Sequence, residues 1–368
     1  MTAQRYSYPL VDALRGVAAL MVLTYHVIEM GVWTTFPTQG GLAVFRYGWV
    51  GVNLFLVISG FVIGLTALRE FDSNGPAFRR PFIVHRLARV VPLYLFTGLV
   101  YVFLVESSVF DRPAPHLFAH VASHLLFLHN LHPSTSGSIN GPNWSVALEM
   151  QFYLVMVWLT PWLARMPAWG MLGGAIVLAA VYRWTTSWLV PHGSVDIHTQ
   201  HVAATQLPGV LEHFAAGIFL ARAMRGEAGV WWKDRMSGGW RNVLWLGLAS
   251  CALLSGAAWL LRSFSYWDRA PMIAFIPTLL AAGMAALVAA VAVVPAQRLR
   301  ALAPMRYLGT VSYGIYLWHV PVILSILQRY PTLAKEKLLA SVLLSVLLLA
   351  MFSWHFLEKP NIQRFKTQ

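Results

Sequence analysis

Charged residues are scarce in this chain. Of its 368 residues only 11% are Asp, Glu, Lys or Arg, whereas soluble globular domains carry about 25%. The hydrophobic fraction is 58% and the mean hydropathy is +0.60. Apolar segments at this density leave little room for a soluble domain, so the composition predicts an all-α polytopic membrane protein.

Cysteine and acidic residues are scarce as well. The single cysteine, Cys251, excludes an internal disulfide and a multi-cysteine metal site, and its apolar neighbours predict a small core residue. Lys and Arg outnumber Asp and Glu by 27 to 14. That excess would suit a nucleic-acid partner, but Lys and Arg of membrane proteins collect in cytoplasmic loops, so we expect no nucleic acid.

Apolar segments of spanning length occur at ten places along the chain. An even number of spans puts both termini on one side of the bilayer. With a cytoplasmic N-terminus, eighteen Lys and Arg residues fall at the cytoplasmic ends of spans and seven at the opposite ends. This asymmetry predicts an N-in, C-in topology. The ten predicted spans are about 9–31, 48–68, 90–108, 144–164, 169–190, 207–224, 242–262, 271–294, 307–328 and 337–357.

The segment 116–131 is apolar but too short and too rich in histidine for a span. We predict a short interfacial or re-entrant helix there, followed by a loop over 133–143. His116, His120 and His124 stand four residues apart, a spacing that can bind a metal ion on one helix face. No acidic ligand accompanies them, so a polar interfacial helix is favoured and we expect no metal.

Two polar residues interrupt the first span. Arg15 and His26 are eleven residues apart, which is about 20° past three helical turns, so both project from one face. They lie about 16 Å apart along the axis, roughly half the thickness of the bilayer core. An ionisable residue inside a membrane indicates a functional site. The alternative is that Arg15 reaches the cytoplasmic surface and His26 is a satisfied core histidine.

The second and fourth spans carry polar residues of the same kind. Asn53 and Ser59 lie in the second, where close helix packing is the alternative explanation. Glu149 lies near the start of the fourth, where a carboxylate is costly. It could pair with Arg15 or Arg183, or orient a histidine; a purely structural ion pair is the alternative.

The sixth and ninth spans add further candidates. Glu212 and His213 stand near the predicted outer end of the sixth span. In the ninth, Ser312, Tyr316 and His319 are spaced four and three residues apart and therefore share a helix face. His319 could be a second histidine of the site or a partner for a helix carbonyl.

Four arginines crowd the predicted cytoplasmic loop before the third span. They are Arg79, Arg80, Arg86 and Arg89. One explanation is positive-inside topology together with anionic lipid headgroups. The other is a phosphate-binding patch, because the guanidinium fork matches phosphate oxygens. Spacing alone favours the first.

Five motifs stand in order between Val11 and Pro321: LVDALRGVAALMVLTYH, GWVGVNLFLVISGF, HRLARVVPLYL, NWSVALEMQFYL and SYGIYLWHVPV. Each is modest alone, but together they resemble acyltransferase family 3, the polytopic bacterial O-acyltransferases that modify glycans and some natural products. Two places depart from the family pattern. The usual paired glutamates read Glu149-Met150, and Glu212 is hard to align.

The resemblance implies acyl transfer from cytoplasmic acyl-CoA, usually acetyl-CoA, to a hydroxyl, with no tightly bound cofactor. His26 is then the general base or a transient acyl carrier. Arg15 would hold the donor or stabilise the oxyanion, Glu149 would orient His26 or the acceptor, and the arginine group would bind the phosphates of CoA. The supporting residues are Asp12, Ser59, Trp144, Ser145, Ser312, Tyr316 and His319.

The resemblance also implies one transmembrane acyltransferase domain over residues 1–368 in a bacterial cytoplasmic (inner) membrane. Some members append a soluble esterase-like domain; this sequence ends ten residues after Glu358, and we expect no such domain. The expected acceptor is a glycan or lipid-linked carbohydrate. A small hydrophobic metabolite is the alternative acceptor, and a transporter without chemistry is the alternative class.

Overall fold

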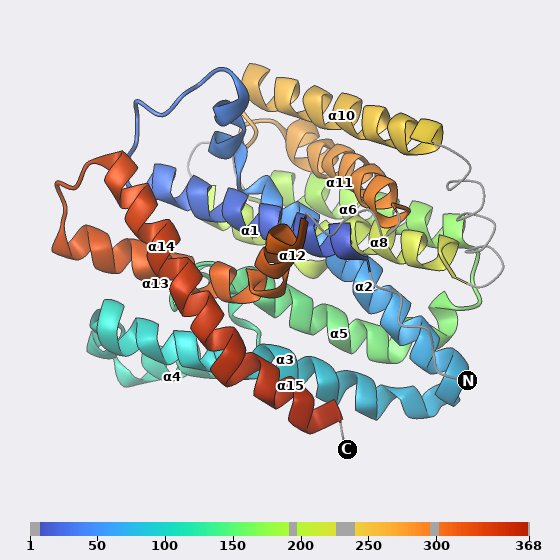
Figure 1. Cartoon of the computed structure of the whole chain (residues 1–368), viewed down its shortest axis with the longest axis horizontal. Helices are drawn as coiled ribbons and strands as arrows, with labels where there is room; N and C mark the ends of the chain where they lie inside the picture. Colours follow the sequence, from blue (N-terminus) through green and yellow to red (C-terminus); the bar gives the residue numbers. More distant parts are fainter. Residues whose placement is uncertain (1–7, 191–196, 226–239, 295–301, 367–368) are drawn as a thin grey trace.

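The computed structural model describes residues 8–190, 197–225, 240–294 and 302–366. Over these ranges the chain is helical and contains no strand, as the sequence predicts. Its long helices run in roughly one direction across the molecule (Figure 1). They are α1 (Pro9–Met30), α2 (Val50–Asn74), α3 (Arg79–Val100), α5 (Asn143–Leu163), α6 (Ala168–Leu189), α10 (Trp240–Ser263), α11 (Ala270–Ala292), α13 (Ser312–Arg329) and α14 (Lys335–Ser353).

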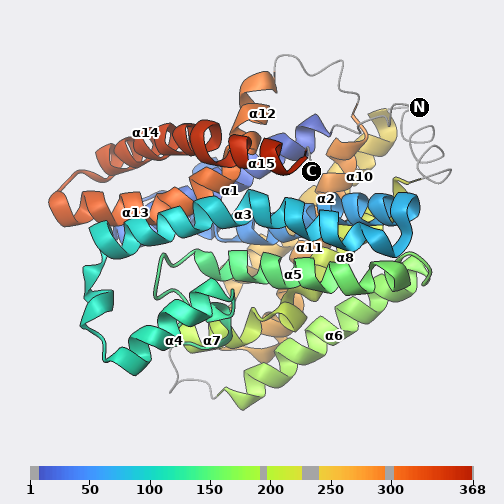
Figure 2. The ribbon, with the colours of Figure 1, turned by 90° about the horizontal axis from the view of Figure 1, so that it is seen from below.

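Shorter helices complete the bundle. They are α4 (Ala114–Leu125), α7 (Ile197–Ala204), α8 (Leu211–Ala223), α12 (Ala303–Thr310) and α15 (Lys359–Lys366), the last joined to α14 by a π-helical turn. Figure 2 shows α4 and α7 together at one end of the molecule. The Lys and Arg residues of the predicted cytoplasmic segments 226–239 and 295–301 lie outside the described residues.

A helix lies at each of the ten predicted span positions, but the helices differ in length. Six described helical stretches are long and apolar enough to cross a membrane, or seven if α12 and α13 form one bent span. One stretch, Val50–Val105, contains both α2 and α3. α8 has thirteen residues, short of the roughly 20 that a span needs. The chain is thus built as a multi-pass membrane protein, and ten spans with N-in, C-in topology stay predictions.

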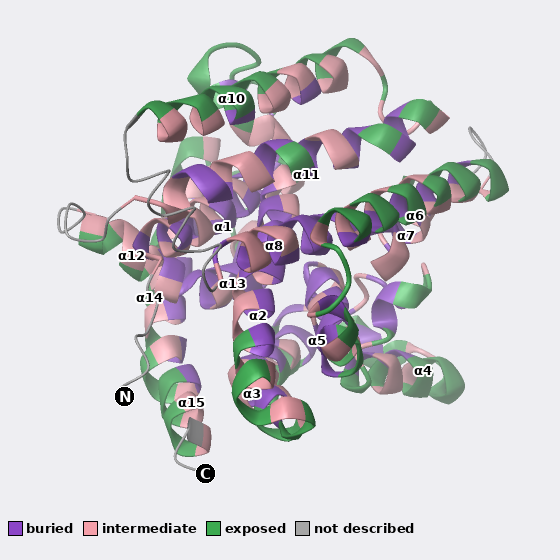
Figure 3. Ribbon diagram, turned by 90° about the vertical axis from the view of Figure 1, so that its right-hand side faces the viewer, coloured by how far each residue is buried: buried purple, intermediate pink, exposed green. Residues whose placement is uncertain are grey.

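Two details correct the sequence analysis. The arginine-rich segment is not a loop, because α3 begins at Arg79 and carries all four arginines on its first three turns. Pro81 is tolerated there because the first turn of a helix needs no intrahelical N–H bond. Cys251 is exposed rather than buried, because α10 lies at the edge of the bundle (Figure 3).

The short helix predicted near 116–131 is confirmed as α4, which has twelve residues. Its apolar side chains Phe118 and Leu125 are 73% and 57% exposed. That combination suits a helix lying at the membrane surface better than a span. The segment after His132 is irregular up to Asn143, where α5 begins, so the predicted loop is confirmed too.

The helix α1 lies at the centre of the molecule, in contact with α2, α11, α12, α13 and α14. Pro9 occupies its first turn, where a missing N–H costs nothing. Small residues let its neighbours approach: a Cβ on Gly16 would stand 2.8 Å from Leu308 of α12, and one on Gly51 of α2 would stand 2.6 Å from the Ala18 carbonyl oxygen. The polar face of α1 is therefore enclosed by other helices.

The crossing of α2 and α8 is a close backbone contact with glycine on both helices. A Cβ on Gly217 would overlap the backbone of Val57 and Phe61, and one on Gly60 would overlap the backbone of Phe214. Small residues of this kind let helices pack closely where lipid supplies no hydrophobic drive.

We expect Gly217→Ala to lower the free energy of unfolding by about 1–3 kcal/mol, because the added methyl has no space in the crossing. Gly173→Ala on α6 is the matched control, since nothing lies within 4 Å of a Cβ there. That change should be neutral or stabilising by up to about 1 kcal/mol. Thermal unfolding in detergent measures both, and equal midpoints for the two variants would contradict the packing argument.

Candidate active site

Arg15 and His26 line two different cavities, and a third cavity shares lining residues with both. Arg15 lines a cavity of 30 Å³, named here the arginine cavity, and a neighbouring connecting cavity of 50 Å³. His26 lines a chamber of 750 Å³. Both residues lie on the uninterrupted helix α1, so their spacing of eleven residues places them on one helix face.

The arginine cavity gathers polar side chains from five helices, α1, α2, α3, α5 and α13. Glu149 of α5 lines it, and Glu149 Oε1 accepts hydrogen bonds from Ser59 Oγ at 3.1 Å and Tyr153 OH at 2.8 Å. The interpretation that Glu149 pairs with Arg183 is wrong, because Arg183 is engaged elsewhere. The other polar lining residues are Arg15, Arg86, Arg89 and Tyr313.

The four arginines of α3 divide into two kinds. Arg86 and Arg89 line the arginine cavity, and the guanidinium of Arg86 lies 5.8 Å from the Tyr153 ring centroid. Arg79 turns away, donates to the Val157 carbonyl oxygen at 3.1 Å and stacks on Trp158. Arg80 is exposed. The structure thus brings two of the four predicted donor-binding arginines to Arg15.

The connecting cavity leads from Arg15 toward the chamber. Its lining includes Arg15, Ser59 and Glu149 at one side and Tyr316 at the other, and Tyr316 also lines the chamber. Ser145 Oγ and Tyr316 OH are 2.6 Å apart, and the Tyr316 hydroxyl also donates to the Pro142 carbonyl oxygen at 3.1 Å. These two predicted supporting residues stand at the junction of the two spaces.

The remaining supporting residues, Ser312, Asp12 and Trp144, differ in what surrounds them. Ser312 Oγ donates to the Gly309 carbonyl oxygen at 2.9 Å where α12 meets α13, and Ser312 also lines the connecting cavity. Within the part of the chain that the structure describes, no guanidinium nitrogen of Arg15 lies within 4.0 Å of a carboxylate oxygen of Asp12, so the two form no ion pair. Trp144 lines the chamber.

The chamber lies where α1 ends and α2, α5 and α11 begin. Aromatic rings form much of its wall: Trp144 stands edge-on to His201 at 4.8 Å between centroids, and Tyr266 edge-on to Trp267 at 4.7 Å. Burial, together with the neighbouring His198, lowers the pKa of His201 to about 4, so this wall histidine is neutral at pH 7.

A second histidine meets His26 at the chamber. His319 Nε2 lies 3.2 Å from His26 Nδ1, and the ring centroids are 4.9 Å apart. His26 Nδ1 is also 2.9 Å from the Val22 carbonyl oxygen, and His319 Nδ1 is 2.6 Å from that of Tyr316. His319 is completely buried, whereas His26 is partly open to the chamber.

One polar group was not foreseen as a unit: the buried ion pair of Arg183 and Glu212. Arg183 Nη1 lies 2.6 Å from Glu212 Oε1, and each side chain is 1% exposed. Helical spacing could not pair the two residues, because they come from different helices, α6 and α8. Asn53 likewise bonds His213, Nδ2 to Nε2 at 2.9 Å.

The histidines near α4 do not converge. His120 contacts Arg112 and Ser138, while the ring of His124 stacks on His129 at 4.0 Å. Among the described residues no group of three or more His, Cys, Asp or Glu side chains could hold a metal ion. Burial lowers the pKa of His124 to about 4 and that of His129 to about 3.

A histidine pair at a chamber wall, an inward-facing arginine group and a chamber between apolar helices form the candidate site of a multi-pass membrane protein. The sequence matches the family described as an acyltransferase domain over residues 8–359. The chain therefore belongs to acyltransferase family 3.

Three relatives resemble nearly the whole chain. "Peptidoglycan O-acetyltransferase OatA" of Listeria monocytogenes is 25% identical over 97% of this chain, and "Putative peptidoglycan O-acetyltransferase YrhL" of Bacillus subtilis is 28% identical over 97%. The chain spans only 56% and 55% of those two proteins. "Putative membrane-bound transacylase BcsY" of Komagataeibacter xylinus is 25% identical over 96% of this chain and 82% of its own length. No solved structure matches the chain.

The stacked pair His124 and His129 predicts a pH dependence of stability. Because the folded pKa values of about 4 and 3 lie below the roughly 6.5 of an unfolded histidine, the unfolded chain binds more protons below that pH. The stabilisation is present above pH 6.5 and is lost as the pH falls toward 4. Melting temperatures in detergent from pH 7.5 to 4 should fall accordingly. His129→Phe keeps the stacking and should flatten this dependence; an unchanged slope would contradict the assignment.

Proposed function

We propose that the protein is a membrane-embedded O-acyltransferase that moves an acyl group, in particular acetyl, from cytoplasmic acyl-CoA to a hydroxyl of a glycan or lipid-linked carbohydrate. The family and the O-acetyltransferase names of the relatives support the reaction class. The observation that carries the proposal is the His26–His319 pair at the wall of a chamber connected to the arginine cavity.

The hydrogen bonds of the pair select one tautomer for each ring. His319 Nδ1 faces the Tyr316 carbonyl oxygen, which only accepts, so Nδ1 carries the proton and Nε2 is an acceptor. His26 Nδ1 faces that acceptor and the Val22 carbonyl oxygen, so it must carry a proton as well. The unprotonated nitrogen of His26 is then Nε2, which makes His26 Nε2 the general base.

The proposed reaction is one acyl transfer inside the chamber. His26 Nε2 takes the proton of the acceptor hydroxyl while the hydroxyl oxygen attacks the thioester carbonyl carbon. The carbon–sulfur bond breaks, the ester forms, and the CoA sulfur leaves with the proton that His26 returns. His319 Nε2 and the Val22 carbonyl oxygen stabilise the transient imidazolium through its Nδ1–H.

The inward arginines suit the phosphates of CoA. Arg15, Arg86 and Arg89 bring three guanidinium groups to one cavity, and such forks bind phosphate oxygens bidentately. The acyl arm would follow the connecting cavity past Tyr316 to the chamber. Because these cavities measure only 30 and 50 Å³, the helices that line them have to move apart when the donor binds. The place of Arg15 supports the donor-holding role over the oxyanion role, since His26 is about 16 Å further along α1.

The chamber suits the acceptor. Its 750 Å³ lies in the range of about 300–1,000 Å³ of small-molecule sites. Trp144, Tyr266 and Trp267 present ring faces and edges, which pack against the apolar face of a sugar while their polar atoms meet its hydroxyls. With the predicted N-in topology, the arginine cavity faces the cytoplasm and the chamber the opposite side of a bacterial cytoplasmic membrane.

Purified protein in detergent or proteoliposomes should transfer acetyl from radiolabelled acetyl-CoA to an oligosaccharide acceptor. His26→Ala should lower the rate about 10²- to 10⁴-fold because the general base is lost. His319→Gln, whose amide oxygen can still accept from His26 Nδ1, should keep more activity than His319→Leu, with KM values little changed. Undiminished transfer by a folded His26→Ala protein would exclude the proposed role.

The arginine group can be tested with a control on the same helix. The Arg86→Ala/Arg89→Ala protein should bind CoA at least tenfold more weakly, because two charge-assisted phosphate contacts are lost. Arg80→Ala removes one positive charge from an exposed position of α3 that does not line the cavity, and it should leave the affinity within about twofold. Calorimetric titration with CoA measures the affinity of both variants. Equal affinities would mean that Arg86 and Arg89 serve only to set the membrane topology.

A further inference from the structure

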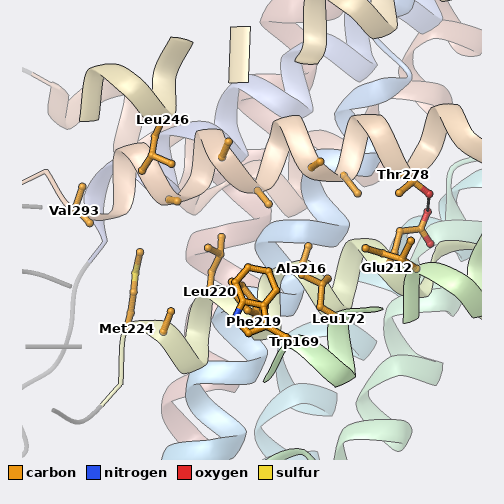
Figure 4. Close-up of a pocket in the computed structure, with 17 residues that line it drawn as sticks. Trp169, Leu172, Glu212, Ala216, Phe219, Leu220, Met224, Leu246, Thr278 and Val293 are labelled. Atoms are coloured by element: carbon orange, nitrogen blue, oxygen red, sulfur yellow. Dashed lines mark hydrogen bonds between the residues drawn. The ribbon is translucent and has the colours of Figure 1, made fainter. Parts of the chain in front are cut away.

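A fourth cavity lies between α6, α8, α10 and α11, and His26 is not among its lining residues. This lateral groove measures 280 Å³ and runs beside α8 from Glu212 to Met224, about 18 Å. Figure 4 shows Glu212 and Thr278 together at one end and Met224 and Val293 at the other. Its floor on α11 is made of alanines 281, 282, 285, 286 and 289.

The groove communicates with the surroundings of the bundle. Ala282 lines it and is exposed, and Trp169, which packs on Phe219 at 4.5 Å between centroids to form a wall, is 74% exposed. In a membrane protein such an apolar opening faces hydrocarbon rather than water. Its size and shape fit one extended aliphatic chain. Such a chain would make van der Waals contacts along the wall, where the small alanine side chains leave space.

The inner end of the groove is different, because it holds a buried acceptor that lacks a donor. Glu212 Oε1 is engaged by Arg183 at 2.6 Å and by Thr278 Oγ1 at 3.5 Å. Glu212 Oε2 is fully buried and has no hydrogen-bond partner among the described residues. An unmatched buried acceptor costs about 1–3 kcal/mol, and more when it is charged. Because Oε2 is closed off by its surroundings, the Glu212 side chain has to move slightly before a ligand in the groove with a hydrogen-bond donor at this end can supply the missing partner.

The surroundings of Glu212 restrict the chemistry of that ligand. Arg183 already uses all five of its N–H groups, on the carbonyl oxygens of Ala274 and Gly209 and on Glu212 and Thr278. No donor of Arg183 is left for a phosphate or carboxylate, and the Glu212 carboxylate would repel either. The polar end of the ligand is therefore neutral and donates, as a hydroxyl does.

We propose that the lateral groove binds a neutral long-chain alcohol, with its aliphatic chain along α8 and its hydroxyl donating to Glu212 Oε2. Arg183 lines the chamber while Glu212 lines the groove, so the ion pair stands between the two spaces. The bound alcohol would complete the hydrogen bonding of this pair. The site is separate from the acyl-transfer site and does not depend on the proposed reaction.

The test uses two probes that differ only in the donor: a dodecanol carrying an aliphatic diazirine, and its methyl ether. Photolysis with the full-length protein in detergent, followed by peptide mass spectrometry, locates the label. We expect the alcohol to label peptides of α8 and α11 about tenfold more than the ether, because a hydrogen bond to a charged acceptor is worth that factor. Equal labelling by both probes, or labelling by neither, would overturn the proposal.

A blocked groove supplies the second readout. Ala282→Phe places a ring in the opening at an exposed position, so the protein should still fold. Labelling by the alcohol should fall at least fivefold in this variant, because the ring blocks the opening. A fivefold loss corresponds to about 1 kcal/mol of binding free energy. Ala249→Phe, at an exposed position of α10 that does not line the groove, should label as the wild type does. Unchanged labelling of an Ala282→Phe protein that melts normally would place the label elsewhere and overturn the assignment.

Discussion

The structure depends on one constraint: a polar side chain inside an apolar helix bundle needs a partner from another helix. An unmatched buried charge or hydrogen-bonding group costs several kcal/mol. Three contacts meet the constraint here. Ser59 of α2 reaches Glu149 of α5, Arg183 of α6 reaches Glu212 of α8, and His26 of α1 reaches His319 of α13 (ring nitrogens 3.2 Å apart). Each pair requires two helices to be neighbours in one rotational setting.

Close backbone packing positions the helices that carry these contacts. Glycines at the α2–α8 crossing and between α1 and α12 let those helix pairs approach closely, and each of the three contacts uses a side chain of α1, α2 or α8. As a result, the polar groups follow one another in order along α1. Guanidinium groups collect near the start of α1, the histidine pair lies near its end, and the connecting cavity joins them past Tyr316.

The irregular parts of the bundle occur where the cavities lie. The 65° break between α12 and α13 places Ser312 and Tyr313 at the connecting cavity. The short helix α8 begins at Leu211, and Glu212 at its first turn borders the lateral groove. Interrupted helices inside a membrane are tolerated where the backbone lines protein-enclosed space rather than lipid. The same interruptions leave room for both the chamber and the groove.

The sequence by itself determined the helical membrane class, the shared face of Arg15 and His26, the short helix near 116–131, and the family. All of these follow from composition, order of motifs, or spacing within one helix, which are local properties of the chain. Only the tertiary structure decided that Arg86 and Arg89 turn inward while Arg79 and Arg80 do not. It also decided that the partners of Glu149 are hydroxyls and that His319 meets His26. Those choices depend on side chains that are up to 293 residues apart, and helical periodicity carries no information about which helices become neighbours or at what rotation.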